Sequence, residues 1–202
     1  MSEVDRIYAL IWSHEEQFAH RLGQEVIDKP VVSVWMILLP VLFVHHMQKV
    51  TSYRIAVRAF AEGVLEPRQK ALDKARQDVE SGESRDCGLD DFFPSFEFAS
   101  DRDRSIADRQ VRVMTILQDH YRKLLQAGRE SYQELLKQVY PGREQYRRFL
   151  DRLTAAEQDL NRYLTEEVHR TEDSRAVVQR METSCDVLRR KELDWFFSSS
   201  SV

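Results

Sequence analysis

Residues that break helices are scarce in this chain: its 202 residues include only six glycines and five prolines. A fold rich in β-turns depends on these two residue types, so the composition argues against a turn-rich β protein. Charged residues, by contrast, make up 32% of the chain, and charged sequences with few glycines are typical of long helices. The composition therefore predicts an all-α protein, most simply with one elongated domain.

Cysteine is scarce as well. Cys87 and Cys185 are the two cysteines, and they lie far apart without a CxxC motif or a Cys/His cluster. Neither a disulfide framework nor a zinc site is therefore indicated, and we expect two reduced structural thiols in a cytosol-facing domain. The chain opens with MSEVD, which contains two acidic residues and no basic one, so a cleaved secretory signal is not expected.

Excess positive charge and catalytic motifs are also lacking. The net charge is −4, which provides no overall basic surface, so we expect no binding to nucleic acid. The sequence contains no glycine-rich phosphate loop, no nucleophile elbow and no triad pattern. We therefore expect a protein that is not an enzyme and that holds no cofactor.

Long hydrophobic runs are absent with one exception, KPVVSVWMILLPVLFVHHMQK, between Lys29 and Lys49. From Val31 to Val44 its only polar side chain is Ser33. As a helix this span would measure roughly 30 Å, the thickness of the hydrocarbon core of a bilayer. Two interpretations are open: a membrane segment, or an all-round buried helix of a soluble bundle in which Pro40 forms a kink.

The flanking charges favour the membrane interpretation. Residues 1–29 carry six acidic and three basic side chains, whereas residues 49–76 carry seven basic and three acidic ones. A basic segment that follows an apolar one is typical of an anchor whose downstream part stays cytoplasmic, and an internal proline is tolerated in a membrane. We expect residues 31–47 to attach the protein to the cytoplasmic face of a membrane, through Trp35, Leu38, Leu39, Pro40 and Phe43.

Helical periodicity divides the rest of the chain. The expected segments are an amphipathic helix over 1–30, the apolar segment 31–48, a basic amphipathic helix over 49–81 with a kink at Pro67, a loop over 82–104, a helical hairpin over 105–197 and a flexible tail over 198–202. The expected fold is an elongated helical bundle built on the C-terminal antiparallel hairpin, with an apolar, proline-containing helix near the N-terminus.

The expected loop contains several phenylalanines, among them Phe92, Phe93 and Phe96. Aromatic side chains favour burial, so plain disorder is not expected. The phenylalanines either fold back over the bundle or bind a partner, and we retain them as candidate interaction residues. The same two alternatives apply to Trp195, Phe196 and Phe197 at the C-terminus, which would cap the bundle or contact a membrane or a partner.

Ser105 is the expected N-cap of the first hairpin helix, with Asp108 in its first turn. That helix should continue to Val139, and Pro141-Gly142 should turn the chain into a second long helix, 143–197. Its apolar heptad pattern is interrupted by a polar layer, which we interpret as solvent-exposed; the alternative is a buried polar site or a register device. The layer comprises Glu157, Glu167, Thr171 and Ser174.

One weak metal motif is present. Glu166 and His169 form a Glu-x-x-His pair on one helical face, as in di-iron bundles, but those proteins require two such pairs and further glutamates. Glu16 and His20, four residues apart, offer a looser complement. An incidental pair on a solvated helix face is the simpler interpretation, and we expect no metal.

The sequence thus leads to an expected function and two alternatives. The expected function is a non-enzymatic helical scaffold or interaction protein on the cytoplasmic face of a membrane, which binds a protein partner or a second copy through its long helices. The alternatives are a soluble bundle with a ligand or metal site, and a soluble coiled-coil adaptor.

Overall fold

The protein is all-α, as the composition predicts. A computed structural model describes residues 2–28, 40–82, 87–94, 98–168 and 171–197, and these contain no strand. The helices are α1 (Glu3–Val26), α3 (Pro40–Ser81), α4 (Leu89–Phe92), α5 (Asp101–Leu125), α6 (Tyr132–Val139), α7 (Arg143–Tyr163), the π-helical turn η1 (Leu164–Val168) and α8 (Glu172–Phe197).

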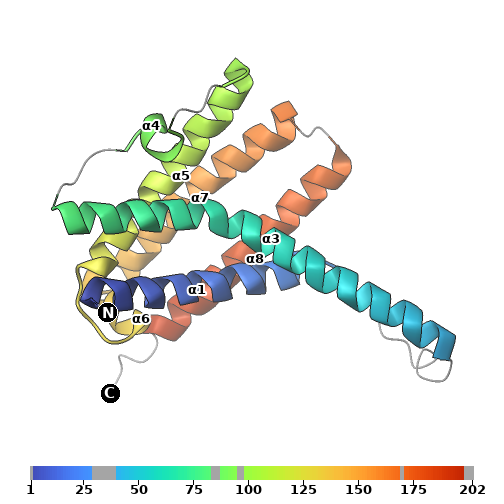
Figure 1. The fold of residues 1–202 in the computed structure, drawn as a ribbon, viewed down its shortest axis with the longest axis horizontal. Helices are drawn as coiled ribbons and strands as arrows, with labels where there is room; N and C mark the ends of the chain where they lie inside the picture. Colours follow the sequence, from blue (N-terminus) through green and yellow to red (C-terminus); the bar gives the residue numbers. More distant parts are fainter. Residues whose placement is uncertain (1, 29–39, 83–86, 95–97, 169–170, 198–202) are drawn as a thin grey trace.

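Five long helices form a closed ring. α1 packs against α3, α3 against α5, α5 against α7, α7 against α8, and α8 returns to α1 (Figure 1). The short helices α4 and α6 pack against α5 at the edge of this ring. α1 also packs against α5 across the ring, so these two helices have three long neighbours each, and all five helices border the interior.

Serine caps define where three of these helices begin. The hydroxyls of Ser2, Ser100 and Ser131 accept hydrogen bonds from backbone N–H groups three residues further on, at the starts of α1, α5 and α6. Such caps satisfy N–H groups that have no partner within the helix. The predicted N-cap at Ser105 is therefore wrong: the N-cap of α5 is Ser100, five residues earlier, and Ser100 with Asp103 provides the cap.

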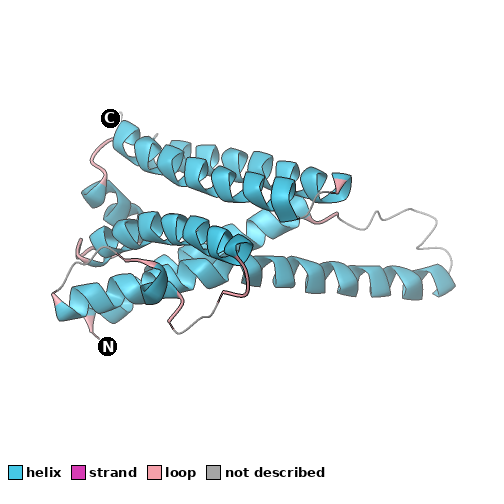
Figure 2. Cartoon of the chain, turned by 90° about the horizontal axis from the view of Figure 1, so that it is seen from above, coloured by secondary structure: helices cyan, strands magenta, loops and turns pink. Residues whose placement is uncertain are grey.

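Helix α3 crosses a predicted boundary. It runs without interruption from Pro40 to Ser81, so the basic helix expected from residue 49 continues into the end of the apolar stretch. Its N-terminal part extends beyond the other helices (Figures 1 and 2). α3 changes direction along its length (Figure 1), and Pro67 inside it is the residue type that kinks helices. Among the described residues, no helix has a stretch both long and apolar enough to cross a membrane.

The C-terminal half differs from the predicted hairpin of two continuous helices. The first is divided into α5 and α6, because Gly128 adopts a left-handed backbone (φ +60°) and Ser131 starts a new helix with a capping box. The second is divided into α7 and α8 around η1. α7 still runs antiparallel to α5, since the side chain of Arg109 pairs with Asp159 and that of His120 stacks on Phe149.

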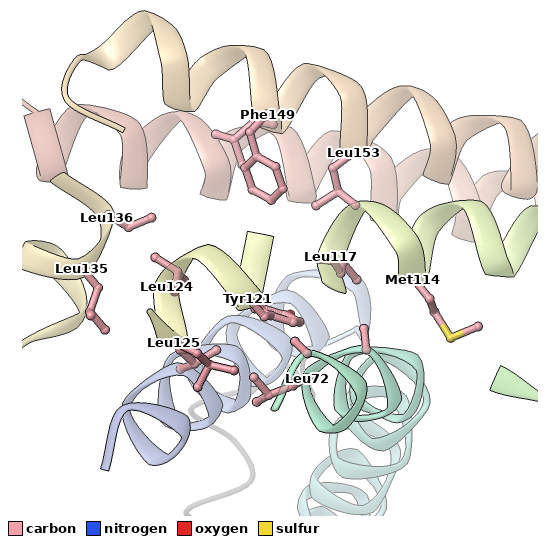
Figure 3. Close-up of a cluster of buried hydrophobic side chains, with 14 of the residues drawn as sticks. Leu72, Met114, Leu117, Tyr121, Leu124, Leu125, Leu135, Leu136, Phe149 and Leu153 are labelled. Carbon is pink, nitrogen blue, oxygen red and sulfur yellow. The ribbon is translucent and has the colours of Figure 1, made fainter. Parts of the chain in front are cut away.

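The main apolar core lies where α5, α6 and α7 meet α1 and α3. Figure 3 shows its side chains pointing toward one another from these helices. Leu72, Tyr121, Leu124, Leu135 and Leu136 are fully buried here. Each such side chain contributes about 1.5–3 kcal/mol when it is removed from water, so this cluster is the main source of stability.

Some of the candidate interaction residues belong to this core. Phe92 and Phe196 are buried in it, and Phe93 and Phe197 pack partly against it. The two buried rings therefore fold back over the bundle instead of presenting an exposed surface. Trp195 differs, because it is 64% exposed, and Phe96 lies outside the described residues.

Candidate ligand-binding cavity

Ionised and polar side chains meet at the centre of the ring. Arg68 of α3 donates a hydrogen bond from Nη1 to Oε2 of Glu15 on α1, at 2.8 Å, and both side chains are less than a tenth exposed. The hydroxyl of Tyr121 on α5 donates to the other oxygen of Glu15 at 2.7 Å. Both carboxylate oxygens of Glu15 therefore have a donor, which a buried carboxylate requires.

Glu157 of α7 extends this network to the fifth helix. It accepts a hydrogen bond from Arg68 at 3.3 Å and a two-point contact from Arg189 of α8, at 2.9 and 2.7 Å. Arg189 also donates to the hydroxyl of Thr154 at 2.6 Å. Each of the five ring helices thus contributes one side chain to a single network, which we call the charged layer: Glu15, Arg68, Tyr121, Glu157 and Arg189.

The pKa values of Glu15 and Arg68 keep both side chains ionised. Burial alone would raise the pKa of Glu15, but the positive charge of Arg68 and the Tyr121 hydrogen bond outweigh burial, so the pKa lies below its ordinary value. For Arg68 burial acts in the opposite sense, and the charge of Glu15 raises its pKa well above normal. Burial, followed by the charge of Glu15, raises the pKa of Tyr121, so its hydroxyl keeps its proton.

The sequence contains a signal for the charged layer that was missed. Glu15 follows Ile11 by four residues and precedes Phe18 by three, so it lies on the apolar face of α1. Arg68 is placed in the same way between Val64 and Leu72, as is Arg189 between Cys185 and Leu193. A charged residue at an apolar-face position on several helices is the pattern of a buried ion network.

The predicted solvent exposure of the polar layer is wrong for Glu157. Its side chain is 23% exposed and is paired with two arginines, so Glu157 is a partly buried member of a polar network. A carboxylate is rarely buried without a partner, and here the partners come from α3 and α8, which the heptad pattern of one helix cannot reveal. Glu167 and Thr171 are exposed, as predicted, whereas Ser174 is partly buried.

A cavity adjoins the charged layer. Its volume is about 230 Å³, and it is lined by residues from all five ring helices. Arg68, Glu157 and Arg189 form one wall, while Gly63 and Gln158, which are exposed, lie at the rim. The cavity is therefore reachable from solvent. Most of the remaining lining is apolar, with Leu22, Val64, Val113, Leu117, Leu160 and Met181.

The α3 side of the cavity has an unusual backbone. Glycine inside a helix costs about 1 kcal/mol relative to alanine, yet a Cβ atom at Gly63 would meet no atom within 4 Å. Helix packing therefore does not require this glycine. Pro67, four residues later, lines the same cavity and has no N–H to donate to the carbonyl of Gly63. The wall thus combines open space with a carbonyl that lacks its usual helical donor.

A histidine is buried beside the charged layer. Nδ1 of His120 on α5 is 2.9 Å from the hydroxyl of Tyr140, and its ring stacks on Phe149. Burial lowers the pKa of His120 to about 3, although the charge of Glu15 acts in the opposite direction. His120 is therefore neutral at physiological pH. Burial likewise raises the pKa of the Cys185 thiol to about 11, so this cavity-lining cysteine keeps its proton at neutral pH.

Three of the four residues of the weak metal motif lie in the described part of the chain. Glu166, Glu16 and His20 are all exposed, and His169 lies outside the described residues. Within the described part of the chain, no three His, Cys, Asp or Glu side chains gather as a metal ion would require. Both cysteines are buried.

Most of the predicted membrane residues lie outside the part of the chain that the structure describes. Trp35, Leu38 and Leu39 lie outside the described residues, and Pro40 is the first described residue of α3. Phe43 belongs to the same helix. Because the residues before Pro40 lie outside the described ones, the predicted kink at this proline stays a prediction.

Comparison with known proteins gives no identity: no family model, no curated protein and no solved structure matches this chain.

Proposed function

We propose that this protein is a non-enzymatic helical bundle that binds a small, largely apolar molecule in the cavity at the centre of the ring. The observation that supports the proposal is the cavity itself: about 230 Å³ of space, mostly apolar walls and one charged wall. Ligand sites are typically apolar hollows with a few fixed polar groups. The volume equals that of roughly eight liquid water molecules, which suits a chain of about six to eight carbons.

Two methionines make a direct test possible. Met181 lines the cavity, whereas Met114 is 1% exposed and does not line it. Titration of the isotope-labelled protein with 1-octanol should shift the methyl resonance of Met181 in a saturable manner and move that of Met114 much less. Equal shifts of both, or none, would contradict a ligand in the cavity.

A variant that fills the cavity sharpens the test. Gly63→Leu adds a side chain at the rim where a Cβ meets open space, so the variant should fold and should weaken octanol binding at least tenfold. Ala59→Leu is the matched control, because Ala59 is an exposed residue of α3 outside the cavity lining. It adds the same side chain and should leave binding unchanged.

Membrane attachment through residues 31–47 is a second candidate function. It is supported by the N-terminal part of α3, which extends beyond the bundle (Figure 2) and exposes Ile55 at 64% between Arg54 and Arg58. An apolar segment flanked by basic residues binds anionic membrane surfaces. The expressed protein should remain in the membrane pellet after carbonate washing. Recovery of all the protein as a monodisperse species without detergent would end this proposal. Binding of a protein partner or a second copy stays a prediction.

A further inference from the structure

The charges around the cavity define the class of ligand. We propose that the cavity binds a cationic amphiphile, namely a primary ammonium group on an apolar chain of roughly six to eight carbons. This inference rests on the proposed function, because it assumes that the cavity is a binding site. It adds the chemical nature of the ligand's polar end.

The two arginines that line the cavity already have carboxylate partners within the protein. Arg68 is paired with Glu15 and Glu157, and Arg189 with Glu157 and Thr154. An anionic ligand would have to break these buried pairs, and each broken pair would leave a carboxylate without a cation. The two arginines therefore hold the protein's own carboxylates and do not form a site for a ligand's carboxylate or phosphate.

Negative charge, by contrast, remains at the α8 side of the cavity. Glu182 and Asp186 line it. Glu182 accepts a hydrogen bond from the neutral amide of Asn161 at 3.0 Å, and among the described residues no arginine or lysine pairs with it. Within the described part of the chain, the only ion pair of Asp186 is a distant one with Arg190, at 3.9 Å, and the side chain of Arg190 is 80% exposed. A pair of this kind contributes little, so these two carboxylates can accept a ligand's ammonium group.

The remaining lining fits the same ligand. The ammonium group has three donors and no acceptor, and Glu182 and Asp186 of the lining offer it carboxylate oxygens. Leu22, Val113 and Met181 supply apolar surface for the chain. The site thus pairs acceptors and negative charge at the rim with an apolar interior.

Three probes that share an eight-carbon apolar chain distinguish a cationic from a neutral or an anionic ligand. They are octylamine, 1-octanol and octanoate, each titrated calorimetrically at neutral pH. Octylamine carries an ammonium group under these conditions, as lysine does. It should bind at least tenfold more tightly than 1-octanol, octanoate should bind most weakly, and added salt should reduce the preference. If 1-octanol or octanoate binds as well as octylamine, the charge inference is wrong while the proposed function stands. If none of the three binds, both are wrong.

Two double variants test whether Glu182 and Asp186 cause the preference for octylamine over 1-octanol. Glu182→Gln combined with Asp186→Asn should lower octylamine affinity to that of 1-octanol measured in the same variant. Glu172→Gln combined with Asp173→Asn removes the same charge from exposed positions of the same helix and should preserve the preference. An unchanged octylamine affinity in the first variant, or an equal loss in both, would overturn the inference.

Discussion

Two parts of the interior, the apolar end beside α6 and the centre of the ring, are built from different kinds of side chain. Where α6 closes the bundle, the interior consists of leucines and aromatic rings, and Leu124, Leu135 and Leu136 are fully buried. At the centre of the ring, buried side chains are ionised, and a cavity lies against them. The apolar end resembles an ordinary close-packed core. The centre combines buried charge with empty space, both of which reduce stability, and we attribute this combination to ligand binding.

Breaking the charged layer at one position should have the largest effect. Arg68→Met leaves the buried Glu15 without its cation, and the loss of a buried ion-pair partner costs about 3–5 kcal/mol of unfolding free energy. Urea denaturation measures this loss. Arg58→Met is the matched control: its pair with Glu62 is exposed at 82% and 63%, so the cost should stay below about 1 kcal/mol. Similar losses in both variants would contradict the importance of burial.

Replacing the whole charged layer should lower the unfolding free energy less than replacing one of its members. A variant in which Glu15, Arg68, Glu157 and Arg189 are all replaced by methionine and Tyr121 by phenylalanine contains no unpaired charge. Apolar replacement of a complete buried network is often neutral or stabilising by about 1–4 kcal/mol, so this variant should unfold at a higher urea concentration than Arg68→Met. A lower midpoint would show that the charged layer itself stabilises the fold.

The apolar end gives the complementary prediction. Leu135→Ala removes a fully buried side chain and should cost about 2–5 kcal/mol, from lost burial and from the cavity left behind. Because Leu135 does not line the ligand cavity, the affinity of the folded variant for 1-octanol should equal that of the wild type. A changed affinity measured under stabilising conditions would mean that the apolar end and the cavity are coupled.

Acid should affect stability through His120. Its pKa is about 3 in the folded protein against an ordinary value of 6.5, so the unfolded chain binds a proton over this interval and the folded one does not. Stability is therefore complete above the ordinary value and is lost as the pH falls below it, by about 2 kcal/mol between pH 7 and pH 5.

Urea denaturation at both pH values measures this change, and the paired variant is His120→Phe, which retains an aromatic ring against Phe149. The variant should lose about 2 kcal/mol less than the wild type over the interval. Parallel losses would show that other groups control the acid sensitivity. Carboxylates contribute mainly at lower pH, since the pKa of Glu15 lies below its ordinary value.

The smallest effect is expected from a single methyl group at the cavity rim. Gly63→Ala should raise unfolding free energy by about 0.5–1 kcal/mol, because alanine favours a helix and no atom lies within 4 Å of the new carbon. Gly23→Ala is the contrast, since its Cβ would lie 3.1 Å from the carbonyl oxygen of Val57. It should gain less or lose stability. An equal gain at both glycines would contradict the open space at Gly63.

Local patterns predicted the helical class but not the centre of the ring. The amphipathic faces of α1, α5 and α7 follow from residue spacing, and the capping box at Ser131, with Glu134 three residues later, was a readable signal for the division of the first hairpin helix. The partners of Glu157 were not readable, because they lie on helices distant in sequence and depend on how the ring closes. The cavity depends on the same closure, so spacing within one helix could not reveal it.

The location of a bound octylamine molecule tests the account most directly. A crystal structure of the protein grown with octylamine should show the chain against Leu22, Val113 and Met181, with its nitrogen about 3 Å from a carboxylate oxygen of Glu182 or Asp186. The charged layer should keep its pairs. An empty cavity beside octylamine bound elsewhere, or a nitrogen directed away from both carboxylates, would contradict the account.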